Sequence, residues 1–193
     1  PSAERLKNYA GFVAGSGITP VMSILKSVLE SEPNSTFVLV YGNKTPEETI
    51  FYTELHELQL KYVGRFFVHY VFSQAKTEET LFGRIEKSAV NFVLNNKHKE
   101  KEFDKFYLCG PEAMINTVST VLKEHNVADK NIKFELFSTS PTAGVNPNAE
   151  AHTGHTKITV LVDDEETTFE MSQKQTVLEA ALKQGIDAPY SCQ

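Results

Sequence analysis

The chain has 193 residues, of which 40% are hydrophobic and 23% charged, an ordinary globular composition. Its formal net charge of -6 argues against nucleic acid or an anionic membrane as the main partner. No apolar run approaches the roughly 18 residues of a membrane-spanning helix, and the first residues contain no signal peptide. Two distant cysteines, Cys109 and Cys192, make no disulfide framework, which favours a cytoplasmic location.

Strand-like and helix-like segments alternate along the first two thirds of the chain. Apolar, β-branched and aromatic runs predict five strands, at residues 9–14, 36–41, 65–73, 103–109 and 132–137. Four helices are expected between them: residues 21–29, a segment from about Glu47, residues 87–94 and residues 112–125. Because such crossovers are right-handed and need helices on both faces, we predict an α/β fold with a doubly wound, five-stranded parallel sheet of order 3-2-1-4-5.

Apolar positions assign a buried face to two of these helices. In the helix from about Glu47 this face is formed by Ile50, Phe51, Leu55 and Leu58. In the helix of residues 112–125 it is formed by Met114, Val118, Val121 and Leu122.

A change of composition divides the chain into an α/β domain (1–138), a linker (139–155) and a smaller α+β segment (156–193). The linker is rich in Ser, Thr, Pro, Gly, Asn and Ala. Beyond it, residues 157–162 and 166–171 predict a hairpin, and residues 175–184 a short helix. This segment is shorter than the roughly 40 residues that fold unaided, and the chain lacks an initiator Met, so we expect it to be part of a longer protein.

The first strand ends in a glycine turn, Gly15-Ser16-Gly17, which is followed by Ile18-Thr19-Pro20. A turn of this kind presents backbone N–H groups and a helix dipole to a phosphate. Glycine permits positive φ and close approach of a ligand, while Pro20 suits a first helical turn. The turn therefore predicts a phosphate site.

A second glycine turn, Cys109-Gly110-Pro111, follows the fourth strand. In the predicted order the first and fourth strands are neighbours, and ligands bind at the carboxyl ends of strands at this switch point. The two turns should therefore face each other across one cleft. Neither GxGxxG nor GxxxxGK[ST] is present, so the site matches neither standard nucleotide motif.

The motifs 14–20 (AGSGITP), 41–45 (YGNKT), 107–111 (YLCGP) and 135–137 (ELF) resemble the nucleotide-binding half of the ferredoxin–NADP reductase family. Residues 188–192 (APYSC) resemble the first ligand segment of a plant-type [2Fe-2S] ferredoxin, so residues 156–193 are expected to form part of a β-grasp ferredoxin domain. Within the family the chain is most similar to oxygenase reductases such as the reductase component of phenylacetyl-CoA epoxidase.

The resemblance implies a role for several residues. The turn Gly15 to Thr19 would hold the pyrophosphate, and Cys109 would lie near C4 of the nicotinamide. Glu135 and Phe137 would meet the flavin ring, and Cys192 would be a cluster ligand. The other expected nucleotide-binding residues are Pro20, Tyr41, Gly42, Asn43, Lys44, Ser73, Gln74, Gly110, Pro111 and Met114. Structural alternatives remain open for two residues: a small buried strand-end side chain for Cys109 and plain interdomain packing for Phe137.

The charge near the second strand favours NADP(H) over NAD(H). NAD-specific sites usually carry an acid at the end of this strand, whereas here Asn43-Lys44 is followed by no acid before Glu47. A lysine pairs with a 2′-phosphate. The Ser-Arg that related reductases often carry after the third strand is replaced by Ser73-Gln74, so NAD(H) stays an alternative. The six histidines show no metal-ligand pattern and are expected to be structural.

The resemblance implies a parent enzyme that takes hydride from NAD(P)H to FAD and passes electrons through a [2Fe-2S] centre to an oxygenase. The family's Arg-X-Tyr-Ser flavin motif is absent, and a plant-type cluster needs four cysteines. We therefore expect a fragment that binds the nucleotide but holds neither FAD nor cluster and is inactive alone, with the FAD domain missing from the N-terminal side. One alternative is a non-catalytic dinucleotide-binding module. A flavohaemoglobin relative is disfavoured by the segment after Ser138.

Overall fold

A computed structural model describes residues 4–136, 154–162, 165–172 and 175–186. The chain divides into two compact units, Pro1–Ser138 and Thr139–Gln193. Most of the expected linker, together with Phe137 and Cys192, lies outside the described residues.

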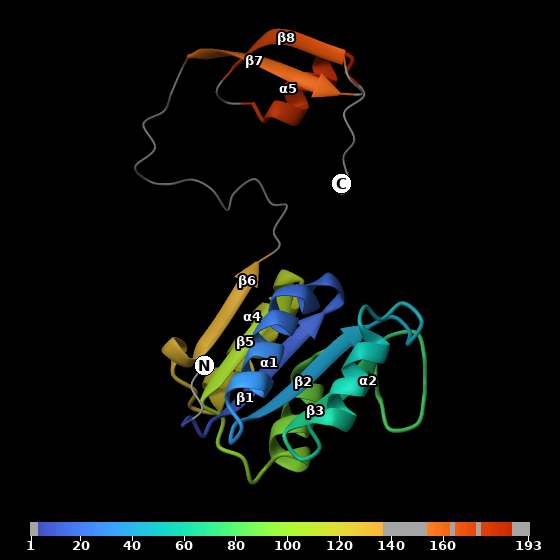
Figure 1. Ribbon diagram of the computed structural model, residues 1–193, viewed down its shortest axis with the longest axis vertical. Coiled ribbons are helices and arrows are strands. Elements are labelled where there is room, and N and C mark those ends of the chain that lie inside the picture. The colour runs from blue at the N-terminus through green and yellow to red at the C-terminus, as the bar shows by residue number, and fades with distance from the viewer. Residues whose placement is uncertain (1–3, 137–153, 163–164, 173–174, 187–193) are drawn as a thin grey trace. The chain divides into compact units, whose positions relative to one another are not determined.

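The first unit is built on a parallel sheet of six strands in the order β4-β3-β2-β1-β5-β6 (Figure 1). The strands are β1 (Asn8–Ala14), β2 (Thr36–Asn43), β3 (Phe66–Phe72), β4 (Leu81–Phe82), β5 (Lys105–Gly110) and β6 (Ile132–Leu136). The prediction of five strands was wrong, because it missed the short edge strand β4. A strand of two residues is too short to show a hydrophobic period in the sequence. β4 is held against β3 by pairing and by a hydrogen bond at its end, in which Gly83 N–H donates to the Phe72 carbonyl at 2.8 Å.

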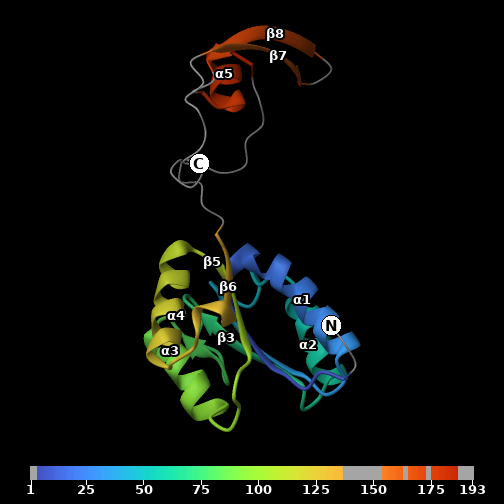
Figure 2. The same ribbon diagram turned by 90° about the vertical axis from the view of Figure 1, so that its left-hand side faces the viewer.

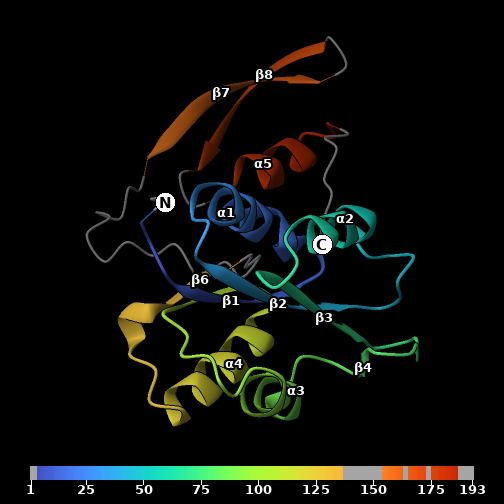
Figure 3. The same ribbon diagram turned by 60° about the horizontal axis from the view of Figure 1, so that its bottom comes forward.

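Two helices cover each face of this sheet. α1 (Ile18–Ser31) and α2 (Tyr52–Lys61) lie on one side, and α3 (Lys87–Phe92) and α4 (Glu112–Glu124) lie on the other, as Figures 2 and 3 show. A π-helical turn (Val93–Lys97) extends α3, and 3-10 turns occur at Gly15–Gly17 and Asp129–Asn131. The expected doubly wound α/β architecture is confirmed.

The central strands are buried on both faces, so successive residues belong to opposite halves of the core. Phe12 and Val40 pack toward α3 and α4, whereas Val13 and Leu39 pack toward α1 and α2. Continuous apolar runs rather than alternating ones follow from this arrangement. The predicted inward face of α4 is confirmed by the burial of Met114, Val118, Val121 and Leu122.

The start of the second helix differs from the prediction. α2 begins at Tyr52 rather than near Glu47, because Phe51 adopts a left-handed φ of 60° that interrupts helical geometry. Ile50 and Phe51 are 40% and 39% exposed, so they do not belong to a buried helix face. Within α2 itself only Leu55 is fully buried, while Leu58 is half-buried.

The second unit contains an antiparallel hairpin and one helix. β7 (His155–Val162) pairs with β8 (Glu165–Ser172), as predicted, and β7 begins one residue inside the expected linker. α5 (Val177–Lys183) is shorter than the predicted helix. Its start is fixed by a capping box, in which Glu179 N–H donates to Thr176 Oγ1 at 3.2 Å and Thr176 N–H donates to Glu179 Oε2 at 2.9 Å.

Every helix in the described ranges is too short or too polar to cross a lipid bilayer.

Candidate functional site

The turn after β1 is held from two sides. Gly15 has φ +54°, a conformation that favours glycine, and a Cβ added to it would meet no atom within 4 Å. The Tyr41 hydroxyl donates to the Gly15 carbonyl at 3.0 Å, and Thr19 Oγ1 donates to the Ser16 carbonyl at 3.0 Å. Burial raises the pKa of the Tyr41 phenol to about 12, so it stays a donor at neutral pH. The backbone of the turn is therefore held in place, and the space next to Gly15 is free of neighbouring atoms.

The two glycine turns touch each other through their backbones. β1 and β5 are paired neighbours, with Val13 opposite Cys109. A Cβ on Gly17 would lie 2.3 Å from the Cys109 carbonyl oxygen, and one on Gly110 would lie 3.2 Å from the Ala14 nitrogen. Only residues without a side chain permit this approach, so the turns form one continuous rim at the switch point of the sheet.

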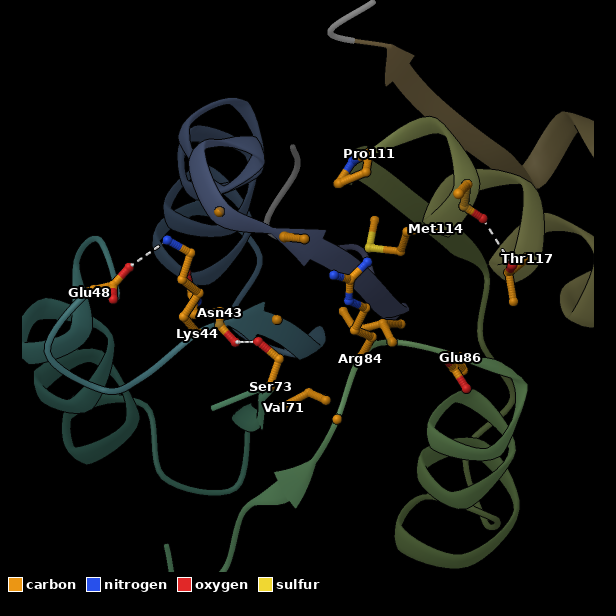
Figure 4. Close-up of a pocket in the computed structure, with 16 residues that line it drawn as sticks. Asn43, Lys44, Glu48, Val71, Ser73, Arg84, Glu86, Pro111, Met114 and Thr117 are labelled. Carbon is orange, nitrogen blue, oxygen red and sulfur yellow. Dashed lines mark hydrogen bonds and ion pairs between the residues drawn. The ribbon is translucent and has the colours of Figure 1, made fainter. Parts of the chain in front are cut away.

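A pocket of about 540 Å³ opens beside this rim (Figure 4). Its walls come from the carboxyl ends of β1, β2 and β3, from the loop after β4 and from the first turns of α4. Of the predicted nucleotide-binding residues, it is lined by Gly15, Gly42, Asn43, Lys44, Ser73, Pro111 and Met114. Residues up to about 100 positions apart in the sequence thus meet at one edge of the sheet.

Two cations line the pocket in different states. Lys44 Nζ lies 3.3 Å from Glu48 Oε2, and both side chains are more than half exposed. Arg84 extends from the loop after β4 toward Pro111 and Met114 (Figure 4), and it has no ion pair or hydrogen bond within the described ranges. Arg84 is therefore available to an anionic ligand, whereas Lys44 is already paired.

Neutral groups complete the polar lining. The Asn43 Nδ2 amide is buried without a hydrogen-bond partner in the described part of the structure. A buried donor of this kind costs free energy unless a ligand satisfies it. Ser73 N–H donates to the Asn43 carbonyl at 3.0 Å and fixes the neighbouring strand end. The open turn at Gly15, the free Arg84 and the unsatisfied Asn43 fit a ligand rich in acceptor oxygens, such as a dinucleotide.

The Cys109 side chain lies in the core beneath the rim. It is 1% exposed and packs in the hydrophobic cluster of the α1 face, so it does not line the pocket. Burial and the carboxylate of Glu135, its register partner on β6, raise the pKa of the thiol. Cys109 is therefore a neutral thiol at physiological pH.

The remaining expected site residues divide into two groups. Residues that do not line the pocket are Ser16, Gly17, Ile18, Thr19, Pro20, Tyr41, Gln74, Gly110 and Glu135. Phe137 and Cys192 lie outside the described residues.

Sequence reasoning missed four polar lining residues: Glu48, Arg84, Glu86 and Thr117. Glu48 could have been found, since it follows Lys44 by four residues and has the opposite charge. Arg84 had no such signal, because the course of residues 74–84 depends on the edge of the sheet.

Two of the histidines, the buried His98 and the half-buried His69, form a pair and are absent from the pocket lining. His69 Nε2 and His98 Nε2 are 2.8 Å apart, and the His98 ring also contacts Phe67 and Phe103. Burial, assisted by His98 and Lys97, lowers the pKa of His69 to about 4. Burial, assisted by Lys101 and Lys97, also lowers the pKa of His98. Both rings are therefore neutral at pH 7, one donating to the other.

Fold and site together define a nucleotide-binding α/β domain. Residues 12–120 match the family described as the oxidoreductase NAD-binding domain. The chain belongs to this family, the nucleotide-binding half of ferredoxin–NADP reductases.

Curated relatives are similar over nearly the whole chain. A component of the 1,2-phenylacetyl-CoA epoxidase of Escherichia coli K12 is 34% identical over 194 residues, which cover 100% of this chain and 54% of the relative. The ferredoxin reductase component of the 3-ketosteroid-9-alpha-monooxygenase of Rhodococcus rhodochrous is 31% identical, over 94% of this chain and 50% of the relative. The chain therefore spans about half the length of these relatives.

Solved structures share the fold. The CS-b5R domains of human Ncb5or in the NAD+ form match with a TM-score of 0.60 and 24% identity, over 67% of this chain and 36% of that one. Ferredoxin-NADP+ reductase from Plasmodium falciparum matches with a TM-score of 0.55 and 22% identity, over 70% of this chain and 53% of that one.

Proposed function

We propose that the chain is the nucleotide-binding part of a reductase that transfers hydride from NAD(P)H to FAD and then passes electrons through a [2Fe-2S] centre to an oxygenase. The observation that carries the nucleotide part is the pocket at the switch point, rimmed by two glycine turns in backbone contact. The reductase part is supported by relatives whose names describe a component of an epoxidase and the ferredoxin reductase component of a monooxygenase.

Each part of the pocket suits one part of the nucleotide. The backbone N–H groups of the Gly15–Thr19 turn, at the N-terminus of the 14-residue α1, would bind the pyrophosphate. Arg84 would add a charge-assisted contact to the same group. Pro111 and Met114, which line the pocket just after the carboxyl end of β5, would place the nicotinamide there.

We propose further that NADP(H) is bound through Lys44, with NAD(H) as a second ligand. Lys44 follows β2, where NAD-specific domains usually carry an acid. The roles of Glu135 and Phe137 beside a flavin, and of Cys192 as a cluster ligand, belong to the same proposal and concern the longer protein. When bound, the nicotinamide supplies the hydride, and the residues of this chain hold and orient it.

Calorimetric titration of the chain with NADP+ and NAD+ tests the proposal. We expect micromolar binding of NADP+ and at least tenfold weaker NADP+ binding by Lys44→Ala. Absence of binding by either nucleotide below 1 mM would overturn the proposal. Adding free FAD and an artificial acceptor should produce no NADPH oxidation above the buffer background, because this chain contributes only a few residues to the proposed flavin and cluster sites.

A further inference from the structure

The Tyr41 hydroxyl lies between two segments that carry proposed nucleotide contacts. Its oxygen is 3.0 Å from the Gly15 carbonyl oxygen and 3.4 Å from the Ile50 carbonyl oxygen. Gly15 belongs to the glycine turn after β1, and Ile50 to the loop of residues 44–51 between β2 and α2. A phenol has one proton, so the bond to Gly15 is the stronger branch and the bond to Ile50 the weaker. One side chain therefore joins both segments. The following inference rests on the proposed function.

The Tyr41 ring is fixed by its packing, so the hydroxyl is held at one position. Tyr41 is 0% exposed and belongs to the hydrophobic cluster that also contains Ile18 of α1 and Leu55 of α2. A ring packed at this density has little freedom to shift. Tyr41 does not line the pocket. It can therefore act on a ligand only through the two carbonyl groups that it holds.

Each of the two segments is also held by a hydrogen bond of its own. In the glycine turn, Thr19 Oγ1 donates to the Ser16 carbonyl at 3.0 Å. In the loop, Thr49 Oγ1 donates to the Thr45 carbonyl at 2.8 Å. No hydrogen bond joins the two segments directly among the described residues. Removing the phenol hydroxyl would therefore leave each segment folded but abolish the tie between them.

We propose that Tyr41 is a positioning residue, whose hydroxyl fixes the distance between the phosphate-binding glycine turn and the loop that carries Lys44. In the proposed complex the turn holds the pyrophosphate of the ligand, and Lys44 holds its 2′-phosphate. A ligand that contacts two sites gains affinity over its parts only when the spacing of the sites matches the ligand. A tie that sets this spacing before binding also lowers the cost of ordering the site. Tyr41 thus strengthens the binding of the whole nucleotide but not of either part alone.

The neighbouring Tyr70 provides a matched control. It is the register partner of Tyr41 on β3, and the centroids of the two rings are 6.4 Å apart. The Tyr70 hydroxyl is also buried, but it has no hydrogen-bond partner in the part of the chain that the structure describes. Tyr41→Phe and Tyr70→Phe therefore remove the same atom from adjacent positions, and only the first breaks a hydrogen bond.

The experiment is titration of the wild-type chain and both variants with NADP+, with 2′-AMP and inorganic pyrophosphate as competitors. We expect Tyr41→Phe to weaken NADP+ binding about fivefold, the usual effect of one lost neutral hydrogen bond. The affinities of 2′-AMP and of pyrophosphate should change less than twofold, because each of them contacts one segment. Tyr70→Phe should bind all three ligands like the wild-type chain. Circular dichroism melting verifies that both variants fold.

Four results would overturn the inference while leaving nucleotide binding established. The first two are an unchanged NADP+ affinity in Tyr41→Phe and an equal loss in Tyr70→Phe. The third is a loss for one competitor as large as that for NADP+, since Tyr41 would then support a single segment. The fourth is a competitor that fails to displace NADP+ from the wild-type chain, since each segment must bind its part of the ligand. Failure of the wild-type chain to bind NADP+ or NAD+ would instead overturn the proposed function and this inference with it.

Discussion

Substituting Gly17 by Ala tests the contact between the two glycine turns. Gly17 has φ -58° and ψ -10°, a conformation that alanine adopts freely. Only the surroundings forbid a side chain: the added Cβ would lie 2.3 Å from the Cys109 carbonyl oxygen, 2.6 Å from its carbon and 3.0 Å from the Gly110 nitrogen. All three are backbone atoms, so no side-chain rotation relieves the overlap.

The expected loss follows from these distances. A carbon–oxygen contact normally lies at roughly 3.3 Å or more, so the turns must separate by about 1 Å. An extra carbon forced into a packed structure lowers the free energy of unfolding by about 1–3 kcal/mol. Gly17→Ala should lie at the upper end of this range, because the neighbouring atoms belong to the backbone and cannot rotate away. For a unit of this size, Pro1–Ser138, about 3 kcal/mol lowers the melting temperature by roughly 10 °C. Nucleotide affinity should fall at least tenfold, since a hydrogen bond lengthened by about 1 Å is lost.

The assay combines thermal melting with titration of NADP+, and Gly64→Ala is the matched control. Gly64 has φ +78°, open space around its Cβ and no place in the pocket lining. The free energy of unfolding of Gly64→Ala should be lower by about 1–2 kcal/mol, through backbone strain alone, and this variant should bind NADP+ like the wild-type chain. Melting and binding of Gly17→Ala within error of the wild-type chain would refute the close approach of the turns.

Three other residues give independent predictions. Arg84→Met should weaken NADP+ and NAD+ about equally, by roughly tenfold, because both carry the pyrophosphate; a loss confined to NADP+ would assign Arg84 to the 2′-phosphate instead. The pKa of His69, about 4 when folded against about 6.5 when unfolded, means that the unfolded chain binds the proton first. The contribution of His69 to the free energy of unfolding is therefore fully present above pH 6.5 and is lost as the pH falls. Urea unfolding should show a decrease of about 2 kcal/mol between pH 7.5 and 5, and His69→Phe should reduce this decrease at least by half. In a Cys192→Ser background, Cys109 should react with a thiol reagent at least 100-fold more slowly than free cysteine, because it is buried and its pKa is raised; rapid labelling would contradict its position in the core.

Local sequence patterns predicted most elements of the first unit. Runs such as residues 36–41 and the apolar face of α4 are long enough to define their own period, and both are found as expected. The start of α2 was not predictable in this way. Its apolar residues Ile50 and Phe51 continue a helical pattern, whereas the hydrogen bonds of the preceding turn and the left-handed Phe51 end that continuity.

The glycine turn after β1 was likewise predicted only in part from the local sequence. Neighbouring residues alone were enough to predict that a strand meets a helix through Gly15-Ser16-Gly17 and that a positive φ would be accommodated there, which Gly15 adopts. The folded chain was needed to explain why Gly17 must lack a side chain, because its neighbour is the Cys109 carbonyl on another strand. Folding also sets the charge of the pocket, by pairing Lys44 with Glu48 and bringing Arg84 in from the sheet edge. Backbone conformation is set by residues next to one another in the chain, whereas close contacts and electrostatic fields depend on residues that only folding brings together.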